Sequence, residues 1–270
     1  MTEFDEDERR TWRGRAATYE RSLAQLCAYP VRSLLDAAGV VAGDRMLDVG
    51  TGPGTVAALA CERGAAVTAV DAEDSMLDAA RRNAPEALVQ HGILPRLDFG
   101  DGAFDAVTAN FVLNHVGDPP AALAELRRVA RAGGRIAFTI WPYPVSPLQR
   151  LWRDVSAALD VPASALPLAA ARADFARTPE GLYSLMEQVG LVDLACHEVS
   201  WTHHTDPEDW WAAPAHGIGF LGKLLASLPP EGVAEARAHF ERLANDYRIP
   251  DGRLALPTSA LIASCTVPSR

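Results

Sequence analysis

The sequence predicts an α/β fold whose core is a doubly wound, mostly parallel sheet. Short apolar runs typical of buried strands alternate with longer segments in which apolar residues recur at helical spacing. Tight links join these segments into strand–helix–strand units, and such units place their strands in parallel. Because a sheet of this kind binds its ligand outside the carboxyl ends of the strands, a ligand site is expected in the loops there.

Seven segments have the composition of strands. The first, RMLDV, runs directly into a glycine-rich loop, and a helix beginning at Pro53, a residue suited to a first helical turn, continues to Gly64. The second strand, AAVTAVD, ends at Asp71 and completes one strand–helix–strand unit. The seven predicted strands cover residues 45–49, 65–71, 87–91, 104–112, 133–141, 191–200 and 257–267.

Helices are expected between and around these strands. Asp118 is a suitable N-cap for one of them, and Gly133-Gly134 a suitable stop. After Trp141 the rhythm changes to proline-punctuated, alanine-rich helical segments that resemble an insertion. The predicted helical regions are two helices within 5–38 separated at Pro30, then 76–82, the segments within 146–178, 179–188 and 206–250.

Composition and charge indicate which kind of binding partner to expect. The chain has 270 residues, 49% of them hydrophobic, and a formal net charge of −10. No basic cluster is dense enough to neutralise a row of phosphates, so a small-molecule partner is expected rather than a nucleic acid. The first ten residues, MTEFDEDERR, are acidic, and no uncharged run approaches a membrane-spanning length. We therefore expect a soluble cytoplasmic protein, either a monomer or a homodimer.

The positions of the cysteines and the single lysine argue against several classes of functional site. The four cysteines lie far apart without the spacing of a metal or redox pair, so they are interpreted as packing thiols and no metal site is predicted. Lys223 is the only lysine in the chain, which excludes a P-loop NTPase and any Tyr-x-x-x-Lys mechanism.

Three features fall at the carboxyl ends of neighbouring predicted strands. They are the loop 50–54, Asp71 and the segment 110–115. Glycines in the loop let backbone N–H groups approach a ligand closely, and an acidic residue about twenty positions further on can accept both hydroxyls of a ribose. That geometry suits NAD or any adenosine ligand, but the loop reads G-x-G-x-G, with its third glycine one residue earlier than in a dinucleotide fingerprint.

Several stretches in this order resemble one known family. LDVGTGPG, VTAVDAEDSML, FDAVTANFVLNHV and ELRRVARAGGRIAFT are similar to motifs of class I S-adenosylmethionine-dependent methyltransferases, in the small-molecule branch that includes the ubiquinone/menaquinone-type enzymes. WRGRAATY resembles the segment by which such enzymes close an N-terminal helix over the cofactor. The resemblance implies lid helices in 1–41, a cofactor-binding core in 42–141 completed by 179–200 and 257–270, and a helical substrate cap in 142–178 and 201–256.

The resemblance also implies a set of cofactor contacts. The glycine loop would lie against the methionyl and ribose portions, Asp71 would bind the ribose hydroxyls, and Tyr19 would meet the methionyl group from the lid. Where relatives commonly carry Gly-Asp-Ala after the third strand, this chain has His91-Gly92-Ile93, so either backbone groups contact the adenine while Ile93 packs on it, or the register differs there. The expected cofactor-binding residues are Tyr19, Gly50, Thr51, Gly52, Asp71, Ala72, Met76, Gly92, Ile93, Asn110, Phe111 and His115.

Catalysis of methyl transfer can rest mainly on alignment, so few catalytic side chains are expected. His115 and Tyr19 are the candidates; a general base is needed only if the acceptor must lose a proton, and His115 can equally be structural or contact the cofactor. His203 and His204 point to opposite faces of a strand, so at most one enters a given pocket. Aromatic residues either form core or line an apolar acceptor pocket, for which Trp12, Tyr19, Trp141, His204 and Trp211 are the candidates.

The sequence thus favours methyl transfer from S-adenosylmethionine to a small, neutral or hydrophobic metabolite. Two other readings stay open at this point: an NAD-dependent oxidoreductase, and a non-catalytic cofactor-binding protein on the same fold. A phosphorylated acceptor also stays open, because Arg150, Arg153 and Arg172 lie in the expected cap.

Overall fold

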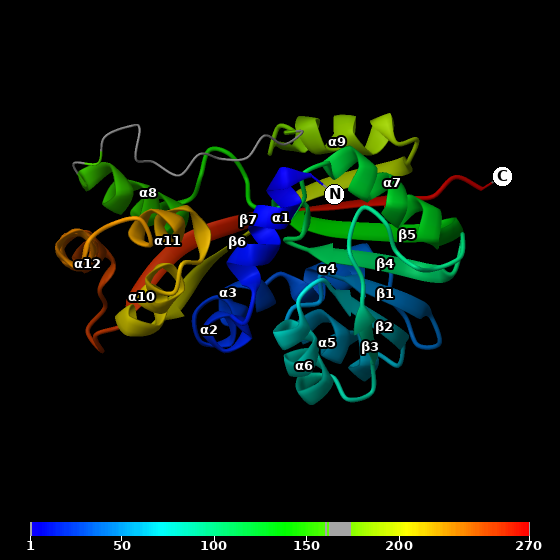
Figure 1. Cartoon of the computed structure of the whole chain (residues 1–270). Helices are drawn as coiled ribbons and strands as arrows, with labels where there is room; N and C mark the ends of the chain where they lie inside the picture. The colour runs from blue at the N-terminus through cyan, green and yellow to red at the C-terminus, as the bar shows by residue number, and fades with distance from the viewer. Residues whose placement is uncertain (1, 160, 162–173, 270) are drawn as a thin grey trace.

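The computed structural model describes residues 2–159, 161 and 174–269, and it confirms the α/β class. Seven strands of the described chain form one sheet in the order β3-β2-β1-β4-β5-β7-β6 (Figure 1). The pairs from β3 to β5 are parallel, and β7 runs antiparallel between β5 and β6. The strands are β1 (Arg45–Val49), β2 (Ala66–Asp71), β3 (Leu88–His91), β4 (Phe104–Asn110), β5 (Ala130–Ile140), β6 (Val192–Thr205) and β7 (Leu254–Thr266).

The central strands are buried on both faces, which explains their continuous apolar composition. One face packs against α7 (Pro119–Val129) and α9 (Pro179–Gln188), and the opposite face against α4 (Val31–Ala37) and α5 (Thr55–Glu62). Helix α6 (Asp74–Asn83) covers β2 and β3. From β1 the chain winds outward to β3 on one side and to β5 on the other, so the order reverses between β1 and β4. That reversal is where a doubly wound sheet opens a crevice for a ligand.

Four short helices precede the sheet where the sequence predicts two. Gly14, with φ +70°, breaks the first long segment, and Leu23 separates the next two helices. The first helix begins at a capping box in which Thr2 and Asp5 satisfy each other's backbone N–H groups. It runs between the sheet and the large helical region on the left of Figure 1. These helices are α1 (Glu3–Trp12), α2 (Ala16–Ser22), α3 (Ala24–Ala28) and α4.

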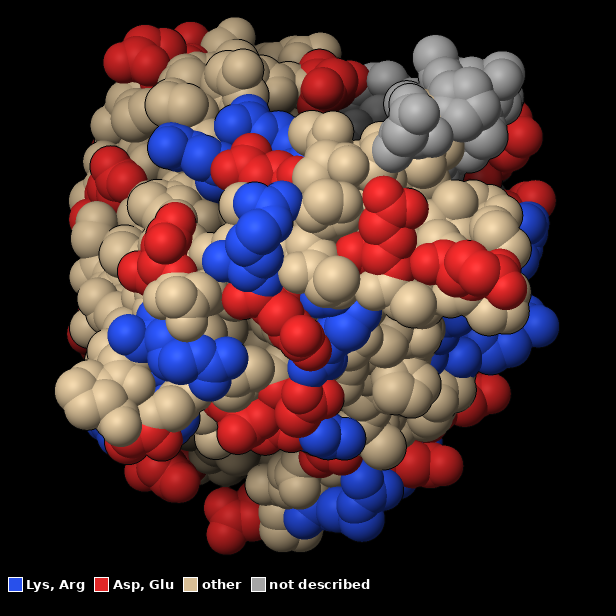
Figure 2. Space-filling view, turned by 90° about the vertical axis from the view of Figure 1, so that its left-hand side faces the viewer, with Lys and Arg blue, Asp and Glu red and all other residues tan. Residues whose placement is uncertain are grey.

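The left-hand helical region, called the cap below, packs on the parts of β6 and β7 that extend beyond β5 (Figure 1). Its core is aromatic: Trp152 stacks on Trp210 at 5.3 Å and on Phe240 at 5.3 Å. On the face of the cap turned to the viewer in Figure 2, acidic and basic side chains are interspersed rather than gathered by sign. The cap comprises α8 (Pro147–Ala158), α10 (Pro207–Ala215), α11 (Gly219–Leu225) and α12 (Pro230–Ala244).

Some predicted boundaries differ from the structure. Gly133-Gly134 does not stop a helix; α7 ends at Val129, and both glycines lie within β5, beside a register shift opposite β4. Asp118 is the N-cap, as predicted, and accepts from the Ala121 N–H. The helical prediction for 146–178 holds for α8, whereas 162–173 lie outside the described residues. The single-turn helices are η1 (Leu113–His115) and η3 (Asn245–Tyr247).

No helix of the described chain is both long and apolar enough to cross a membrane. In the same residues, no three His, Cys, Asp or Glu side chains gather as ligands for a metal ion, and the four cysteines are free thiols.

Candidate active site

The glycine loop leaves β1 at the sheet's crevice with its backbone in the left-handed region. Gly50, Gly52 and Gly54 have φ values of +64°, +54° and +89°, which side chains with a Cβ rarely adopt. A Cβ on Gly50 would lie 2.5 Å from a methyl carbon of Val112, so this glycine is also required for packing against the turn after β4. A Cβ on Gly52 would meet only the Tyr19 ring, at 3.9 Å. Gly52 is therefore the position at which a side chain would enter the crevice.

Asp71 connects the end of β2 to this loop. Its carboxylate accepts from the Gly52 N–H at 2.9 Å and from the Glu73 N–H at 3.0 Å. Burial raises the pKa of Asp71, and these backbone N–H groups act against that rise. The acidic group thus lies at the strand tip beside the loop, as the spacing in the sequence predicts.

A second carboxyl group, Asp48, lies beneath the loop and was not among the sequence-based candidates. It is 1% exposed on β1, and it accepts from the Thr51 hydroxyl at 2.7 Å and the Thr108 hydroxyl at 3.0 Å. Burial raises the pKa of Asp48 to about 7. The available signal was a lone acidic residue inside the apolar strand RMLDV, since a buried carboxyl group needs hydrogen-bond partners.

The end of β4 is held by a short polar network. Asn110 donates to the Cys27 carbonyl of α3 at 2.9 Å and accepts from the Thr139 hydroxyl at 2.7 Å. The same hydroxyl oxygen accepts from the Phe111 N–H at 2.7 Å. Phe111 has φ +58°, an uncommon value for a residue with a side chain, and this turn directs its ring onto Trp141.

Helices α2 and α3 close over the loop. Tyr19, Cys27, Gly50, Gly52 and Asn110 line a cavity of about 20 Å³, together with Ala24, Thr51, Pro53, Thr55 and Val56. That volume has room for about one water molecule. Burial, with a hydrogen bond to Cys27 as a further cause, raises the pKa of the Tyr19 hydroxyl well above its usual range. Helices α2 and α3 thus lie over the glycine loop, and α1 to α3 are called the lid below, after the role that the resemblance predicts for them.

Comparison with known proteins identifies the central part of the chain. Residues 47–138 match the family model of a methyltransferase domain. The demethylmenaquinone methyltransferase of Renibacterium salmoninarum is 38% identical over 113 residues, which cover 42% of this chain and 48% of that protein. Residues 47–138 therefore form a methyltransferase domain. The chain matches only about half the length of this curated relative.

Solved structures agree on the fold. The YcgJ protein of Bacillus subtilis superposes with a TM-score of 0.58 at 18% identity, covering 90% of this chain and 99% of that one. Phosphoethanolamine N-methyltransferase 2 of Haemonchus contortus, solved with phosphomonomethylethanolamine and S-adenosylhomocysteine, gives 0.54 at 17% identity and covers 88% and 52%.

The residues of the methyltransferase domain fit S-adenosylmethionine in chemistry. The glycine loop offers backbone groups without an intervening Cβ at Gly52, and Asp71 can accept from ribose hydroxyls. The cavity of about 20 Å³ beside the glycine loop, lined in part by Tyr19, is far too small for a nucleoside.

The predicted adenine region lies beside Asp71. The Gly92 N–H donates to the Asp71 carbonyl at 3.0 Å, and a Cβ at Gly92 would lie 2.9 Å from the Cβ of Val70. Ile93 follows and forms an isolated bridge with Arg96. Ala72 begins the turn into α6, where Met76 is buried against Ala16 of α2. These residues surround the end of β2 and β3, and their contacts with adenine stay predictions.

His115 faces the lid helix α1. Its Nδ1 lies 2.7 Å from the Glu8 carboxylate, and its ring meets Trp12 edge-on at 5.4 Å. Trp12 in turn contacts Tyr19 at 5.7 Å, and His115 is not among the residues that line the cavity under Tyr19. A catalytic role for His115 or Tyr19 stays a prediction. The contact between His115 and Glu8 supports the alternative that His115 is structural.

The proposed acceptor residues fall into separate places. Trp141 stacks on Phe111 at 3.9 Å and lies 6.3 Å from Trp201, so it extends from the end of β4 toward the cap. Trp211 lies instead in the cap core, 5.2 Å from Phe240. The structure does not bring Trp211 and Trp141 into contact.

Of the two adjacent histidines, His203 is the one that points inward. It is 5% exposed and lies 5.5 Å from Trp210, whereas His204 is exposed on the opposite face of β6. Burial, with a smaller effect of His204, lowers the pKa of His203 to about 4, so its ring is neutral at physiological pH. Strand alternation correctly predicts that only one of the pair points inward, but the sequence-based candidate for the acceptor site was His204, and the structure turns His203 inward instead.

Proposed function

We propose that this protein transfers a methyl group from S-adenosylmethionine to a small, neutral or hydrophobic metabolite. The observation that carries the proposal is the convergence of the glycine loop, Asp71 and Asn110 at the ends of three neighbouring strands, within a domain of methyltransferase sequence. That match favours methyl transfer over the nicotinamide alternative, whose loop would space its glycines differently.

In this proposal the residues of the chain align the cofactor with the acceptor and exclude water from the site. When bound, S-adenosylmethionine supplies an electrophilic methyl group for in-line displacement. Asp71 and the glycine loop hold the ligand in one orientation, and Tyr19 with Trp12 covers it from the lid. Holding two reactants in line is worth about 7 to 11 kcal/mol in well-oriented systems. The proposal therefore requires no metal ion and no covalent intermediate.

An apolar acceptor is supported by the surroundings of Asn110. Phe111, Trp141 and Trp201 form a continuous aromatic wall from the end of β4 toward the cap. Arg150 and Arg153 of α8 are exposed, and Arg153 lies 3.8 Å from Asp154. Arg172 lies outside the described residues. A neutral, hydrophobic acceptor therefore suits the described surface better than a phosphorylated one.

Calorimetric titration with S-adenosylhomocysteine tests the site directly. We expect saturable binding by the natural protein and at least about tenfold weaker binding by Gly52→Asn. Asparagine tolerates the left-handed backbone, so its side chain should occupy the crevice without unfolding the loop.

Gly43→Asn is the matched control, because Gly43 has φ +88° and no atom within 4 Å of an added Cβ. Equal affinity of Gly52→Asn and Gly43→Asn would exclude the loop as the binding site. Binding of NADH in place of S-adenosylhomocysteine would favour the oxidoreductase reading. Conversion of S-adenosylmethionine to S-adenosylhomocysteine with a hydrophobic acceptor distinguishes an enzyme from a binding protein.

A further inference from the structure

Charged side chains join the lid to two other parts of the molecule. Asp7 and Glu8 lie on α1, His115 on η1 after β4, and Lys223 on α11 of the cap. These four residues, called the clasp below, come from segments more than one hundred residues apart. The only lysine of the chain is one of them.

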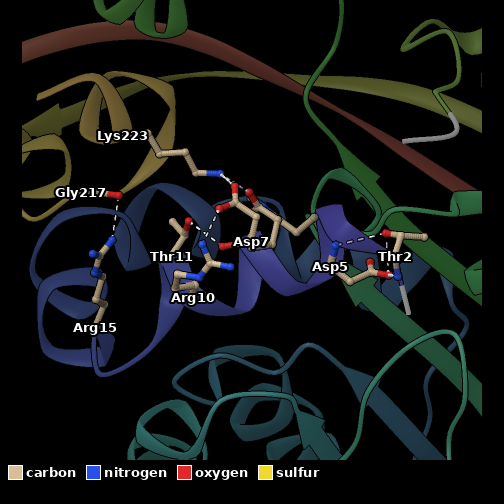
Figure 3. A network of polar contacts seen from close by, with 10 residues as sticks. Thr2, Asp5, Asp7, Arg10, Thr11, Arg15, Gly217 and Lys223 are labelled. Atoms are coloured by element: carbon tan, nitrogen blue, oxygen red, sulfur yellow. Dashed lines mark hydrogen bonds and ion pairs between the residues drawn. The ribbon is translucent and has the colours of Figure 1, made fainter. Parts of the chain in front are cut away.

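The distances within the clasp are those of direct hydrogen bonds, and the two contacts of Lys223 are also ion pairs. Lys223 Nζ lies 2.6 Å from Asp7 Oδ2 and 3.0 Å from Glu8 Oε1. The other oxygen of Glu8, Oε2, lies 2.7 Å from His115 Nδ1. Figure 3 shows the Lys223 side chain descending from the cap onto the α1 helix at Asp7. One carboxylate, Glu8, thus bridges the cap and the methyltransferase core.

The Glu8–Lys223 pair at the centre of the clasp is more shielded than an ordinary surface ion pair. The Glu8 side chain is 13% exposed and that of Lys223 27%. Burial alone would raise the pKa of Glu8, but His115 and Lys223 outweigh it and hold that pKa at about 2. Exposed ion pairs contribute little because solvent screens them, whereas partly buried, multiply bonded charges contribute more.

The clasp acts on the helix that ends beside the cofactor crevice. Trp12, the last residue of α1, contacts both His115 and Tyr19. The neighbouring α2 is tied to the cap as well, because Arg15, just before it, donates to the Gly217 carbonyl at 2.7 Å (Figure 3). In addition, Arg21 of α2 pairs with Asp209 of α10. Tyr19 of α2 lines the cavity of about 20 Å³ beside the glycine loop, which is too small for the cofactor, so binding would require these helices to move.

We propose that Lys223, Glu8, Asp7 and His115 are positioning residues that hold the lid shut and set the rates at which the cofactor binds and leaves. The proposal rests on the proposed function, since it assigns regulation of the same crevice. It requires two states, a closed lid with the clasp formed and an open lid with the clasp broken. Loss of the clasp should therefore increase the population of the open state.

Hydrogen exchange of the free protein tests the clasp without any cofactor. We expect Lys223→Met, which keeps the length of the side chain but removes its charge, to speed amide exchange in residues 3–22 by at least about tenfold. Lys223→Arg keeps the charge and should retain most of the protection.

Arg237→Met is the matched control. Arg237 pairs with Glu208 and Glu241 inside the cap, and its side chain is 24% exposed, close to the value for Lys223. It should leave exchange in residues 3–22 unchanged. If amide exchange in residues 3–22 were equally fast in the natural protein and in Lys223→Met, the proposal that the clasp holds the lid would be overturned.

Stopped-flow binding of S-adenosylhomocysteine tests the effect on the cofactor. In Lys223→Met we expect both the association and the dissociation rate to rise, by about tenfold or more, because an open lid favours passage in both directions. Unchanged rates would overturn the proposal even if the lid exchanges faster. If the natural protein did not bind S-adenosylhomocysteine, the proposed function would be contradicted. The hydrogen-exchange experiment would still show whether the clasp holds the lid shut.

Discussion

One buried carboxyl group beneath the crevice, that of Asp48, makes the stability of the protein depend on pH. Asp48 is 1% exposed beneath the glycine loop, and two threonine hydroxyls donate to it. Its pKa, raised to about 7 by burial, means that the folded protein binds a proton there more tightly than the unfolded chain does. This group's contribution to stability therefore falls as pH rises from about 4 to about 7.

Asp48→Asn should remove that fall. One proton can change the free energy of unfolding by at most about 1.4 kcal/mol per pH unit, so the natural protein should lose stability between pH 5 and 7 relative to the variant. Denaturant unfolding of both proteins at several pH values measures the difference. Parallel pH profiles would show that Asp48 has an ordinary pKa in the folded state.

Residues close in sequence were easier to find than residues brought together by the fold. Gly50 and Gly52 follow β1, and Asp71 and Asn110 end β2 and β4, so strand order alone places them together at the carboxyl ends of neighbouring strands. The contact of Lys223 with Asp7 has no local pattern, because 216 positions separate them. Only the packing of the lid against the cap creates it.

At the scale of elements, the cap is held by an aromatic core of its own. Phe240 of α12 is 0% exposed and lies 5.3 Å from Trp152 of α8 and 5.2 Å from Trp211 of α10. Phe240 therefore joins three helices of the cap, α8, α10 and α12.

Phe240→Ala should destabilise the protein by about 3 to 5 kcal/mol, the usual cost of removing a buried phenylalanine ring. Chemical denaturation measures this loss. Because Phe240 does not touch the glycine loop, affinity for S-adenosylhomocysteine should change little under conditions where the variant is folded. A loss below about 1 kcal/mol would mean that the cap core is not packed as described.

Helices were harder to delimit than strands from the sequence. The seven strands all appear, with β6 and β7 longer than predicted because their pairing with each other continues into the cap. The N-terminal segment forms four helices instead of two, since Gly14 and Leu23 interrupt a continuous apolar pattern. Periodicity reports which face is buried, but the breaks depend on how each short helix packs.

At the scale of the whole molecule, the sheet, the lid and the cap meet at one crevice. The strand order reverses between β1 and β4, and the lid crosses that point between the sheet and the cap (Figure 1). The repeated strand–helix pattern predicted the sheet, and the resemblance predicted the lid. The closed state of the lid could not be predicted, because it depends on Tyr19 filling the crevice and on charges from distant segments.

A crystal structure of the protein with S-adenosylhomocysteine tests the central claim most directly. The expected result is a ligand along the glycine loop, with its ribose hydroxyls on Asp71, its amino-acid portion near Asn110, and Tyr19 moved from its present position. A ligand bound elsewhere, or an unliganded crevice still closed by Tyr19 at saturating S-adenosylhomocysteine, would contradict the account.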